Sequence, residues 1–414
     1  MSAEYFTSMG DLVRGFASAM NLIDPEIQNH HERVAYLAFR LAEEMGLPSE
    51  QRRMTFFAAL LHDVGGVLSR GELSLKDLEK NARMLAASGA VLLKLFPATA
   101  PLSDAVQESQ TPWRRLRGLG KQLLAPQHIG QIVHLADAVS LLLNEKDSVL
   151  NQIARIQEEL RRSNAEFSPT VLAAFDRLAG REYVWMDLLY RPQRILDYLA
   201  GESAVSLDET ISLTGFMSKV IDFRSPFTAM HSAGVAATAV SLARLVGMSE
   251  DECKMMRIAG NLHDVGKLKI PNSILEKPGK LTDEEFNVMK EHAYYTYVLL
   301  KDIRGFEQIT QWAAYHHEKL TGSGYPFHLQ EHEIPLGSRI MAVADIFSAI
   351  TEDRPYRKGM AREQVISILR EDAERGQLSS AMVELLVAHF DEINARREEE
   401  SRLASKSYQE SLTR

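Results

Sequence analysis

The sequence predicts an all-α protein made of two tandem helical domains that are joined by a helical linker. Apolar residues recur at helical spacing in almost every segment, and no run alternates apolar and polar residues as a half-buried strand does. In addition, two segments of the chain are similar to each other in sequence. Placing His30 over His231 brings the pair His62-Asp63 over the pair His263-Asp264 without a gap, and the intervening apolar residues and glycines agree. Such self-similarity indicates a duplicated domain.

The first domain is expected to cover residues 1–203. Apolar spacing predicts an amphipathic helix over residues 1–21 and a second one from His30 to Gly46, where the glycine ends it. A third helix is predicted from Ser49 to Val64. The pair His62-Asp63 would then lie near the end of that helix.

A linker and the second domain are expected after the first domain. Leu141–Arg162, rich in Glu, Arg and Gln, is expected to form one long helix, and Gly201-Glu202-Ser203 is the expected boundary. The second domain would cover residues 204–414. After a slip in register the repeat resumes, so that Asp137 in the first copy corresponds to Asp345 in the second.

Composition excludes several classes of protein. The single cysteine, Cys253, rules out a disulfide framework and fits a reducing cytosol. The N-terminus lacks a secretion signal and no apolar run is long enough to cross a bilayer, so we expect a cytoplasmic protein without a membrane partner. The net charge of −9 argues against binding to a nucleic-acid polymer.

The chemistry of the chain centres on Gly260–Pro278, which contains the pair His263-Asp264. Two adjacent side chains leave a helix about 100° apart, so other elements must supply further ligands if they share an ion. The candidates form a set of seven histidines and aspartates: His231, His263, Asp264, His292, His316, His317 and Asp345. Seven groups are more than one ion needs, which predicts two metals with Asp264 between them. Lys267 should lie on the same side while the helix lasts.

These residues lie in motifs that resemble the HD-GYP domain, a branch of the HD superfamily of metal-dependent phosphohydrolases that cleaves bacterial cyclic dinucleotides. The resemblance covers about Leu213–Phe390. It rests on LHDVGKLKIP, ILEKPGKLTDEEF, the run KEH ending at His292, HHEKLTGSGYP, EIPLGSRIMAVADIFSAI and EDRPYRKGM. The first copy is similar to a degenerate HD domain. The resemblance therefore implies a regulatory or structural first domain and a catalytic second one.

The resemblance also implies a role for each site residue. His231, His263, Asp264 and Asp345 would hold one divalent metal ion, and Asp264, His292, His316 and His317 the other. Fe or Mn is expected, with Ni, Zn and Mg left open. Lys267 would contact the scissile phosphate beside the catalytic Asp264. Tyr325, Arg354 and Arg357 would contact the phosphates and bases of the substrate.

Some positions depart from the family pattern. Phe227 stands where members with three metals have a glutamate ligand, so two metals are expected, although Asp222 is close in sequence. Thr321 replaces an aspartate before the first glycine of the GYP loop. These departures concern loop shape and substrate preference, and both cyclic di-GMP and 3′,3′-cGAMP stay open as substrates.

The first copy keeps His30, His62, Asp63 and Asp137 but has Gly66 in place of Lys267. Those four residues could hold one metal ion or could be hydrogen-bonded remnants of the duplication. The basic patch at Arg114, Arg115 and Arg117 is typical of a solvated face. The isolated histidines are expected to be packed or exposed without a metal: His134, His328, His332 and His389.

Three functions are consistent with these residues. The first is a cyclic-dinucleotide phosphodiesterase that yields a linear dinucleotide, or mononucleotides after a second cleavage. The second is another HD phosphohydrolase that acts on nucleoside triphosphates or alarmones. The third is a signalling protein that binds a cyclic dinucleotide without cleaving it. The GYP motif favours the first over the second, Lys267 favours it over the third, and a homodimer stays open.

Overall fold

The chain folds into two compact units in the computed structural model, which describes residues 7–22, 29–68, 75–97, 99–118, 124–193, 195, 204–224, 231–353 and 358–412. The N-terminal unit comprises residues 20–202, and the C-terminal unit comprises residues 1–19 and 203–414. The sequence assigned residues 1–203 to the first domain. The first 19 residues instead belong to the C-terminal unit.

Backbone pairing and apolar packing account for this difference. Strand β1 (Thr7–Ser8) pairs antiparallel with β2 (Ala204–Val205). The next helix, α1 (Met9–Asn21), places the ring of Phe16 against that of Phe216 on α12 (Leu207–Arg224), with 5.7 Å between ring centroids. These two-residue strands form the only sheet in the described residues, so the all-α prediction is confirmed.

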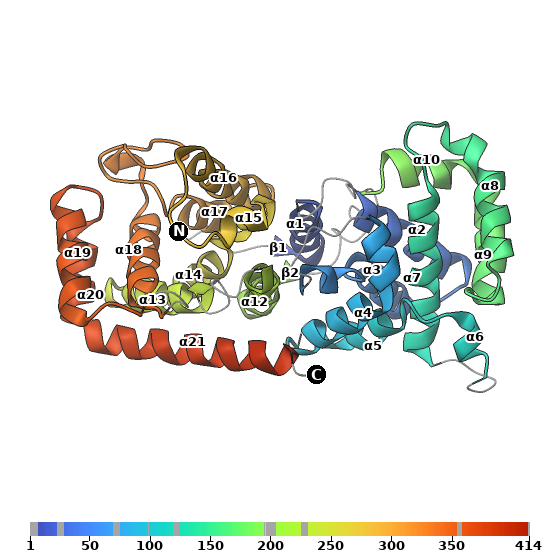
Figure 1. Cartoon of the computed structure of the whole chain (residues 1–414), viewed down its shortest axis with the longest axis horizontal. Helices are drawn as coiled ribbons and strands as arrows, with labels where there is room; N and C mark the ends of the chain where they lie inside the picture. The colour runs from blue at the N-terminus through green and yellow to red at the C-terminus, as the bar shows by residue number, and fades with distance from the viewer. Residues whose placement is uncertain are drawn as a thin grey trace. The chain divides into compact units, whose positions relative to one another are not determined.

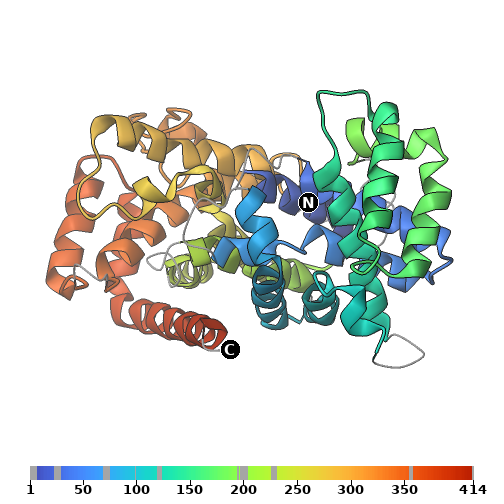
Figure 2. The same ribbon diagram turned by 45° about the vertical axis from the view of Figure 1, so that its right-hand side comes forward.

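The N-terminal unit is a bundle around α2, which packs against both α3 and α7. Helices α8 and α9 lie side by side at one edge of it (Figures 1 and 2). Its core includes the fully buried rings of Phe56, Phe175 and Trp185. The elements are α2 (His30–Glu44), α3 (Ser49–Leu60), η2 (Val64–Leu68), α4 (Leu75–Lys94), η3 (Ala100–Leu102), α5 (Ser103–Glu108), α6 (Trp113–Leu116), α7 (Ala125–Leu142), α8 (Val149–Arg162), α9 (Pro169–Ala179) and α10 (Glu182–Tyr190).

The single helix expected over Leu141–Arg162 is wrong, because α7 ends at Leu142 and α8 begins at Val149. Gln152 stabilises the turn between them. Its side-chain oxygen accepts the backbone N–H of Asn144 at 2.8 Å, and its amide donates to the Asn144 carbonyl oxygen at 2.9 Å. Both helices lie inside the N-terminal unit.

The C-terminal unit is organised around α13, which packs against α14, α18 and the long α21 (Figures 1 and 2). The buried rings of Phe306, Trp312 and Phe347 form part of its core. After α12 its elements are α13 (His231–Leu245), α14 (Glu250–Leu262), η4 (Val265–Lys269), α15 (Asn272–Leu275), α16 (Asp283–Leu300), α17 (Glu307–Ala314), η5 (Glu331–Glu333), α18 (Leu336–Thr351), α19 (Arg362–Glu374), α20 (Ser380–Ala388) and α21 (Phe390–Leu412).

Local signals set the helices that carry the site. Gly247, with φ of 84°, follows the end of α13, a conformation that glycine adopts without strain. Ser249 caps α14 by accepting the backbone N–H of Glu252, and Thr282 caps α16 in the same way with Glu285. These signals set the end of α13 and the starts of α14 and α16.

The predicted repeat is visible in both units. In each copy one helix ends before a His-Asp pair, and a short 3₁₀ helix follows. That 3₁₀ helix packs closely against the next long helix through a glycine. A Cβ at Gly65 would lie 2.0 Å from the backbone oxygen of Leu85, and a Cβ at Gly266 would lie 2.0 Å from that of His292. Leu85 therefore occupies the position of His292 in the first copy.

Within the described residues, the helices are too short or too polar to cross a membrane.

Candidate metal centre

The pair His263-Asp264 lies in a turn rather than on a helix. Helix α14 ends at Leu262, and Asp264 precedes the 3₁₀ helix η4. Nε2 of His263 lies 3.2 Å from Oδ2 of Asp264. The helix therefore ends before the pair, and the two side chains converge because the turn directs both toward one interior region.

Three of the imidazoles are oriented in the same way. Each places Nδ1 against the backbone carbonyl oxygen three residues earlier, so Nδ1 carries the proton and Nε2 is left as a lone-pair donor. The bonds run from His263 to Gly260 at 2.8 Å, from His292 to Met289 at 2.6 Å and from His316 to Ala313 at 2.6 Å. Backbone bonds of this kind fix the orientation of a metal-binding histidine before any ion is bound.

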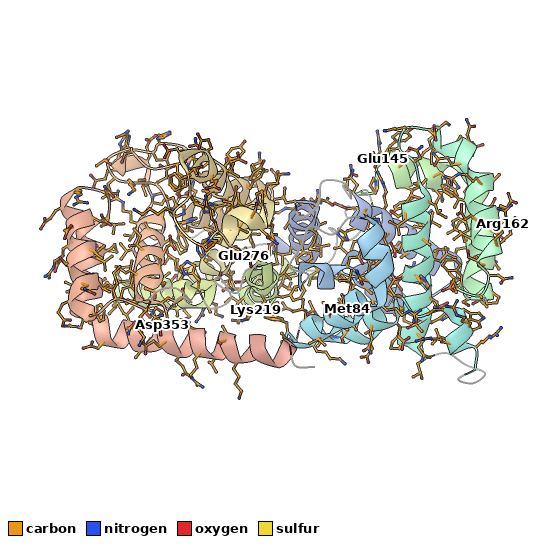
Figure 3. All side chains as sticks on the ribbon, viewed as in Figure 1. Met84, Glu145, Arg162, Lys219, Glu276 and Asp353 are labelled. Carbon is orange, nitrogen blue, oxygen red and sulfur yellow. The ribbon has the colours of Figure 1, made fainter. Side chains whose placement is uncertain are left out.

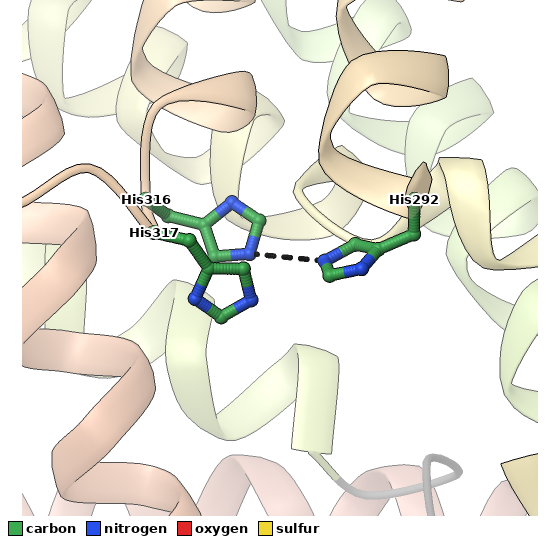
Figure 4. Close-up of side chains that lie close together, drawn as sticks. All are labelled: His292, His316 and His317. Atoms are coloured by element: carbon green, nitrogen blue, oxygen red, sulfur yellow. Dashed lines mark hydrogen bonds between the residues drawn. The ribbon is translucent and has the colours of Figure 1, made fainter. Parts of the chain in front are cut away.

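His292, His316 and His317 form one group of potential ligands (Figure 4). His292 comes from α16, and the histidine doublet follows α17. Nε2 of His292 lies 3.5 Å from Nε2 of His316, and one nitrogen from each of the three rings falls within 4.8 Å of the others. A single cation could therefore contact all three imidazoles.

His231, His263 and Asp264 form the second group, again with ligand atoms within 4.8 Å of one another. Asp345 on α18 joins it, because its Oδ1 lies 3.0 Å from Nε2 of His231. Two carboxylates connect this group to the first. Oδ1 of Asp264 lies 3.5 Å from Nε2 of His292, and Oδ2 of Asp345 lies 4.0 Å from Nδ1 of His317. All seven predicted residues therefore meet in one centre.

Electrostatics give most of these side chains the protonation state that a metal ligand needs. Burial lowers the pKa of His292 to about 4 and that of His316 to about 3, so both rings are neutral at pH 7. Burial would raise the pKa of Asp264, but the nearby His263 and Lys267 hold it well below the usual range. Neutral imidazoles beside ionised carboxylates are the forms that bind divalent cations.

His231 differs from the other histidines. Burial would lower its pKa, but the nearby carboxylates of Asp345 and Glu352 raise it to about 10. Oε2 of Glu352 lies 3.4 Å from Nδ1 of His231, and the glutamate is only 5% exposed. Metal-binding histidines often have a carboxylate next to the ring nitrogen that does not bind the metal. Glu352 is the first residue of the motif EDRPYRKGM, and no role was predicted for it from the sequence.

The residues present fit a pair of divalent cations. Nε2 of His263 is buried and makes no hydrogen bond within the described residues. A buried nitrogen of this kind requires a partner that the protein does not provide. The donor set consists of imidazole nitrogens and carboxylate oxygens without thiolate, which suits first-row divalent ions such as Fe, Mn or Zn.

Lys267 lies beside this centre as expected, although η4 rather than an α-helix positions it. Side chains three residues apart lie one above the other in a 3₁₀ helix. Nζ of Lys267 is 2.5 Å from Oδ2 of Asp264, and its side chain is 20% exposed. The ammonium group is therefore within reach of a ligand that approaches the metal ligands.

Tyr325 lies against the centre, with its ring centroid 4.8 Å from that of His317. Burial raises the pKa of its phenol above the usual value, so the hydroxyl keeps its proton. Gly322 has a φ of 74°, and a Cβ at Gly324 would lie 2.4 Å from a backbone nitrogen. Both glycines are therefore required by the turn that carries Tyr325.

Glu318, a second residue without a role predicted from the sequence, holds the loop that carries Tyr325. Glu318 is buried and accepts two backbone N–H groups, from Phe327 at 2.7 Å and from Leu329 at 3.0 Å. These bonds tie the chain just after Tyr325 to the chain just after the histidine doublet. In the sequence, the signal for this role is the position of Glu318 directly after His316-His317 in the motif HHEKL.

Some predicted positions lie outside the described residues. These are Arg354, Arg357 and Phe227, together with the side chain of Asp222. Their predicted roles stay predictions.

The N-terminal unit contains a smaller version of this centre. Nε2 of His30 lies 3.2 Å from Oδ1 of Asp137, and Nε2 of His62 lies 3.0 Å from Oδ2 of Asp63. His62 donates from Nδ1 to the carbonyl oxygen of Ala59 at 2.7 Å, as His263 does to Gly260, and its buried Nε2 makes no hydrogen bond within the described residues. The four residues could therefore hold one metal ion.

The N-terminal unit has other residues at the positions that correspond to His292, His316 and His317. Leu85 stands in the position of His292, as the glycine contacts show. Ser109 donates to the carbonyl oxygen three residues earlier, at Val106, which is the contact that His316 makes in the C-terminal unit. The next residue, Gln110, contacts Asp137 where His317 faces Asp345. None of these three replacements offers an imidazole.

Comparisons with known proteins agree with this duplication. Two family models match, both described as the HD domain, one over residues 215–379 and the other over residues 27–142. The two matches lie in the two units that the structure separates. HD domains are metal-dependent, and both matched regions contain His/Asp groups that could bind metal.

Two curated relatives carry names that describe phosphodiesterases. The 3'3'-cGAMP-specific phosphodiesterase 1 of Vibrio cholerae is 31% identical over 385 residues, which cover 90% of this chain and 89% of that protein. The cyclic di-GMP phosphodiesterase response regulator RpfG of Xanthomonas campestris is 40% identical over 238 residues, or 57% of this chain and 55% of that protein.

A solved structure has the same fold. The crystal structure of a cyclic GMP-AMP specific phosphodiesterase of V. cholerae aligns with a TM-score of 0.63 at 22% sequence identity, covering 93% of this chain and 98% of that one. Both HD-domain matches and a relative that aligns over nine-tenths of the chain lead to one conclusion: the chain belongs to the HD-GYP branch of the HD-domain proteins.

Proposed function

We propose that the C-terminal unit hydrolyses a phosphodiester bond of a 3′,3′ cyclic dinucleotide with the help of two divalent metal ions. The observation that carries this proposal is the convergence of seven histidines and aspartates into two groups that Asp264 and Asp345 connect. A single bound cation would not need so many ligands. The names of the curated relatives support the substrate class.

The ligands divide between the two ions by distance. His231, His263 and Asp345 would contact the first ion, while His292, His316 and His317 would contact the second. Asp264 would bridge, since its two oxygens face different groups, with Oδ2 near His263 and Oδ1 near His292. Fe or Mn is the proposed identity, because imidazole with carboxylate suits both.

Two bound divalent ions would supply an activated water and neutralise the phosphate oxygens. The protein residues would do the remaining work. Lys267 would place its ammonium group at the 3′ oxygen that leaves, where it stabilises or protonates the developing charge. Tyr325 would present its neutral hydroxyl and ring to the substrate next to His317. Arg354 and Arg357 would form forked contacts with the second phosphate.

We further propose 3′,3′-cGAMP as the preferred substrate over cyclic di-GMP. A relative that aligns along nearly the whole chain is named for 3'3'-cGAMP, whereas a relative named for cyclic di-GMP aligns over little more than half. Both units of this chain are therefore shared with the cGAMP-specific protein. A kinetic comparison of the two substrates on one preparation tests this preference.

The function itself is tested with protein loaded anaerobically with Mn or Fe. We expect it to linearise both cyclic dinucleotides and to leave a nucleoside triphosphate and an alarmone intact, as measured by chromatography of the products. Hydrolysis of the triphosphate or alarmone alone would instead identify another HD phosphohydrolase. Recovery of bound but uncleaved cyclic dinucleotide would identify a binding protein.

Replacing Glu318 with glutamine should loosen the loop that carries Tyr325. A glutamine amide can accept only one of the two backbone N–H groups that the carboxylate now accepts. Bonds to a charged group contribute about 1.5–3 kcal/mol each, so we expect the free energy of unfolding to fall by about 2 kcal/mol. Because substrate contacts depend on position, kcat/KM should fall by about tenfold or more.

The matched control is Glu331→Gln, which changes an exposed glutamate of the same segment. Thermal unfolding and hydrolysis of the cyclic dinucleotide should both stay near those of the unchanged protein. Equal behaviour of the two variants would mean that Glu318 does not position the loop.

A further inference from the structure

The N-terminal unit contains an open cavity of about 500 Å³ beside its His–Asp group. Residues of α4, of the segment after α5 and of α7 line it, and Met84 of α4, labelled in Figure 3, is one of them. A volume of roughly 300–1,000 Å³ is usual for a small-molecule site. The cavity lies within a single unit, so all of its lining residues belong to one compact body.

Groups that donate hydrogen bonds dominate the polar lining of this cavity. Arg83 contributes an exposed guanidinium, Asn81 and Gln110 contribute amides, and His134 contributes an imidazole. Glu166 is the acidic residue in the lining, and it forms an ion pair with Arg114. An arginine and amides around one space favour an anionic ligand, and phosphate suits the guanidinium in particular.

The cavity touches the His–Asp group through Gln110. The Gln110 amide donates to Oδ2 of Asp137 at 2.8 Å, and the same side chain lines the cavity. His134 lies one helical turn before Asp137 on α7, and its side chain also lines the cavity. The cavity therefore borders the His–Asp group through two side chains, Gln110 and His134.

We propose that this cavity binds a small phosphate-bearing anion, about the size of a mononucleotide, with Arg83 as the main phosphate contact. The site is distinct from the C-terminal centre and goes beyond the proposed phosphodiesterase activity. Cleavage is not part of the proposal, because Leu85, Ser109 and Gly66 stand where the C-terminal unit has His292, His316 and Lys267. The N-terminal unit is then a ligand-binding unit.

The test uses guanosine 5′-monophosphate (GMP), guanosine and inorganic phosphate as probes of the full chain. Binding is measured by calorimetry in an Asp264→Asn background, which disables the C-terminal centre and leaves the cavity untouched. We expect saturable binding of one GMP per chain, competition by inorganic phosphate and at least tenfold weaker binding of guanosine. Absence of saturable GMP binding, or equal affinity for guanosine, would overturn the proposal.

Two substitutions locate the site. Arg83→Gln should weaken GMP binding by roughly 10–100-fold, the usual effect of losing a charge-assisted contact. Arg53→Gln, which changes an exposed arginine of α3 outside the cavity, should leave GMP binding unchanged. His134→Gln should also weaken GMP binding and provides a second variant if the first is poorly folded by circular dichroism. Equal GMP affinity in the Arg83 and Arg53 variants would place the ligand elsewhere.

Discussion

Replacing Asp264 with alanine should abolish hydrolysis of the cyclic dinucleotide and lower the metal content by two ions per chain. Its two oxygens face both groups of ligands, so the substitution removes a ligand from each metal ion at once. It also removes the partner of Lys267. Because the chemistry depends on both ions, kcat/KM should fall by at least about 10³-fold. Product chromatography and elemental analysis of the same sample measure the two effects.

The duplication provides a matched control for this substitution. Asp63 has the same position in the N-terminal unit, in a turn after a buried helix and beside a histidine with the same backbone bond. Asp63→Ala should therefore leave hydrolysis and the two C-terminal ions in place. Asp264→Asn, which keeps the shape of the side chain, guards against loss of the fold. Full activity in the Asp264 variants would mean that the metals, and hence the reaction, lie elsewhere.

The sequence predicted well which side chains would meet, because these residues are chemically distinctive and lie in ordered motifs along the chain. Histidine and aspartate are uncommon in a buried core, so seven of them within ordered motifs stand out against the apolar spacing. Whether they meet depends on the packing of α13, α14, α16 and α18, which the duplication supported but could not establish. The structure shows that they meet, and it also gives the backbone bonds that orient the rings.

Residues that act through another residue were harder to predict. Glu318 and Glu352 resemble ordinary surface glutamates in the sequence, and only their burial and contacts show that they hold a loop and a histidine. Leu85 and Gln110 could not be matched with His292 and His317 because the identity of the residues has changed. Backbone contacts around Gly65 and Gly266 made the first match visible.

The prediction of one helix over Leu141–Arg162 was wrong for a similar reason. The apolar and charged pattern continues from α7 into α8, but Gln152 stabilises a turn through two bonds to the backbone of Asn144. Such side-chain bonds compete with helical hydrogen bonds and leave little trace in periodicity. The first 19 residues were misplaced because their strand partner lies about two hundred residues away, at Ala204–Val205.

Replacing Lys267 with alanine should separate metal binding from catalysis. The lysine is not one of the proposed metal ligands, so both ions should stay bound and the affinity for the cyclic dinucleotide should change little. A positioned acid or charge at the leaving oxygen contributes typically about 10²–10⁴-fold, so we expect kcat to fall by about 10²–10³-fold. Steady-state kinetics with metal analysis on the same preparation tests this.

The control for this substitution is Lys269→Ala, because Lys269 belongs to the same 3₁₀ helix and is also partly buried. In a 3₁₀ helix, side chains three residues apart point in the same direction. Lys269 lies only two residues after Lys267, so the two side chains point in different directions. Lys269→Ala should keep nearly full kcat. If Lys267→Ala instead lost its metal ions along with its activity, the role of the ammonium group would be to orient Asp264, whose Oδ2 lies 2.5 Å from Nζ. The leaving oxygen would then need another proton source.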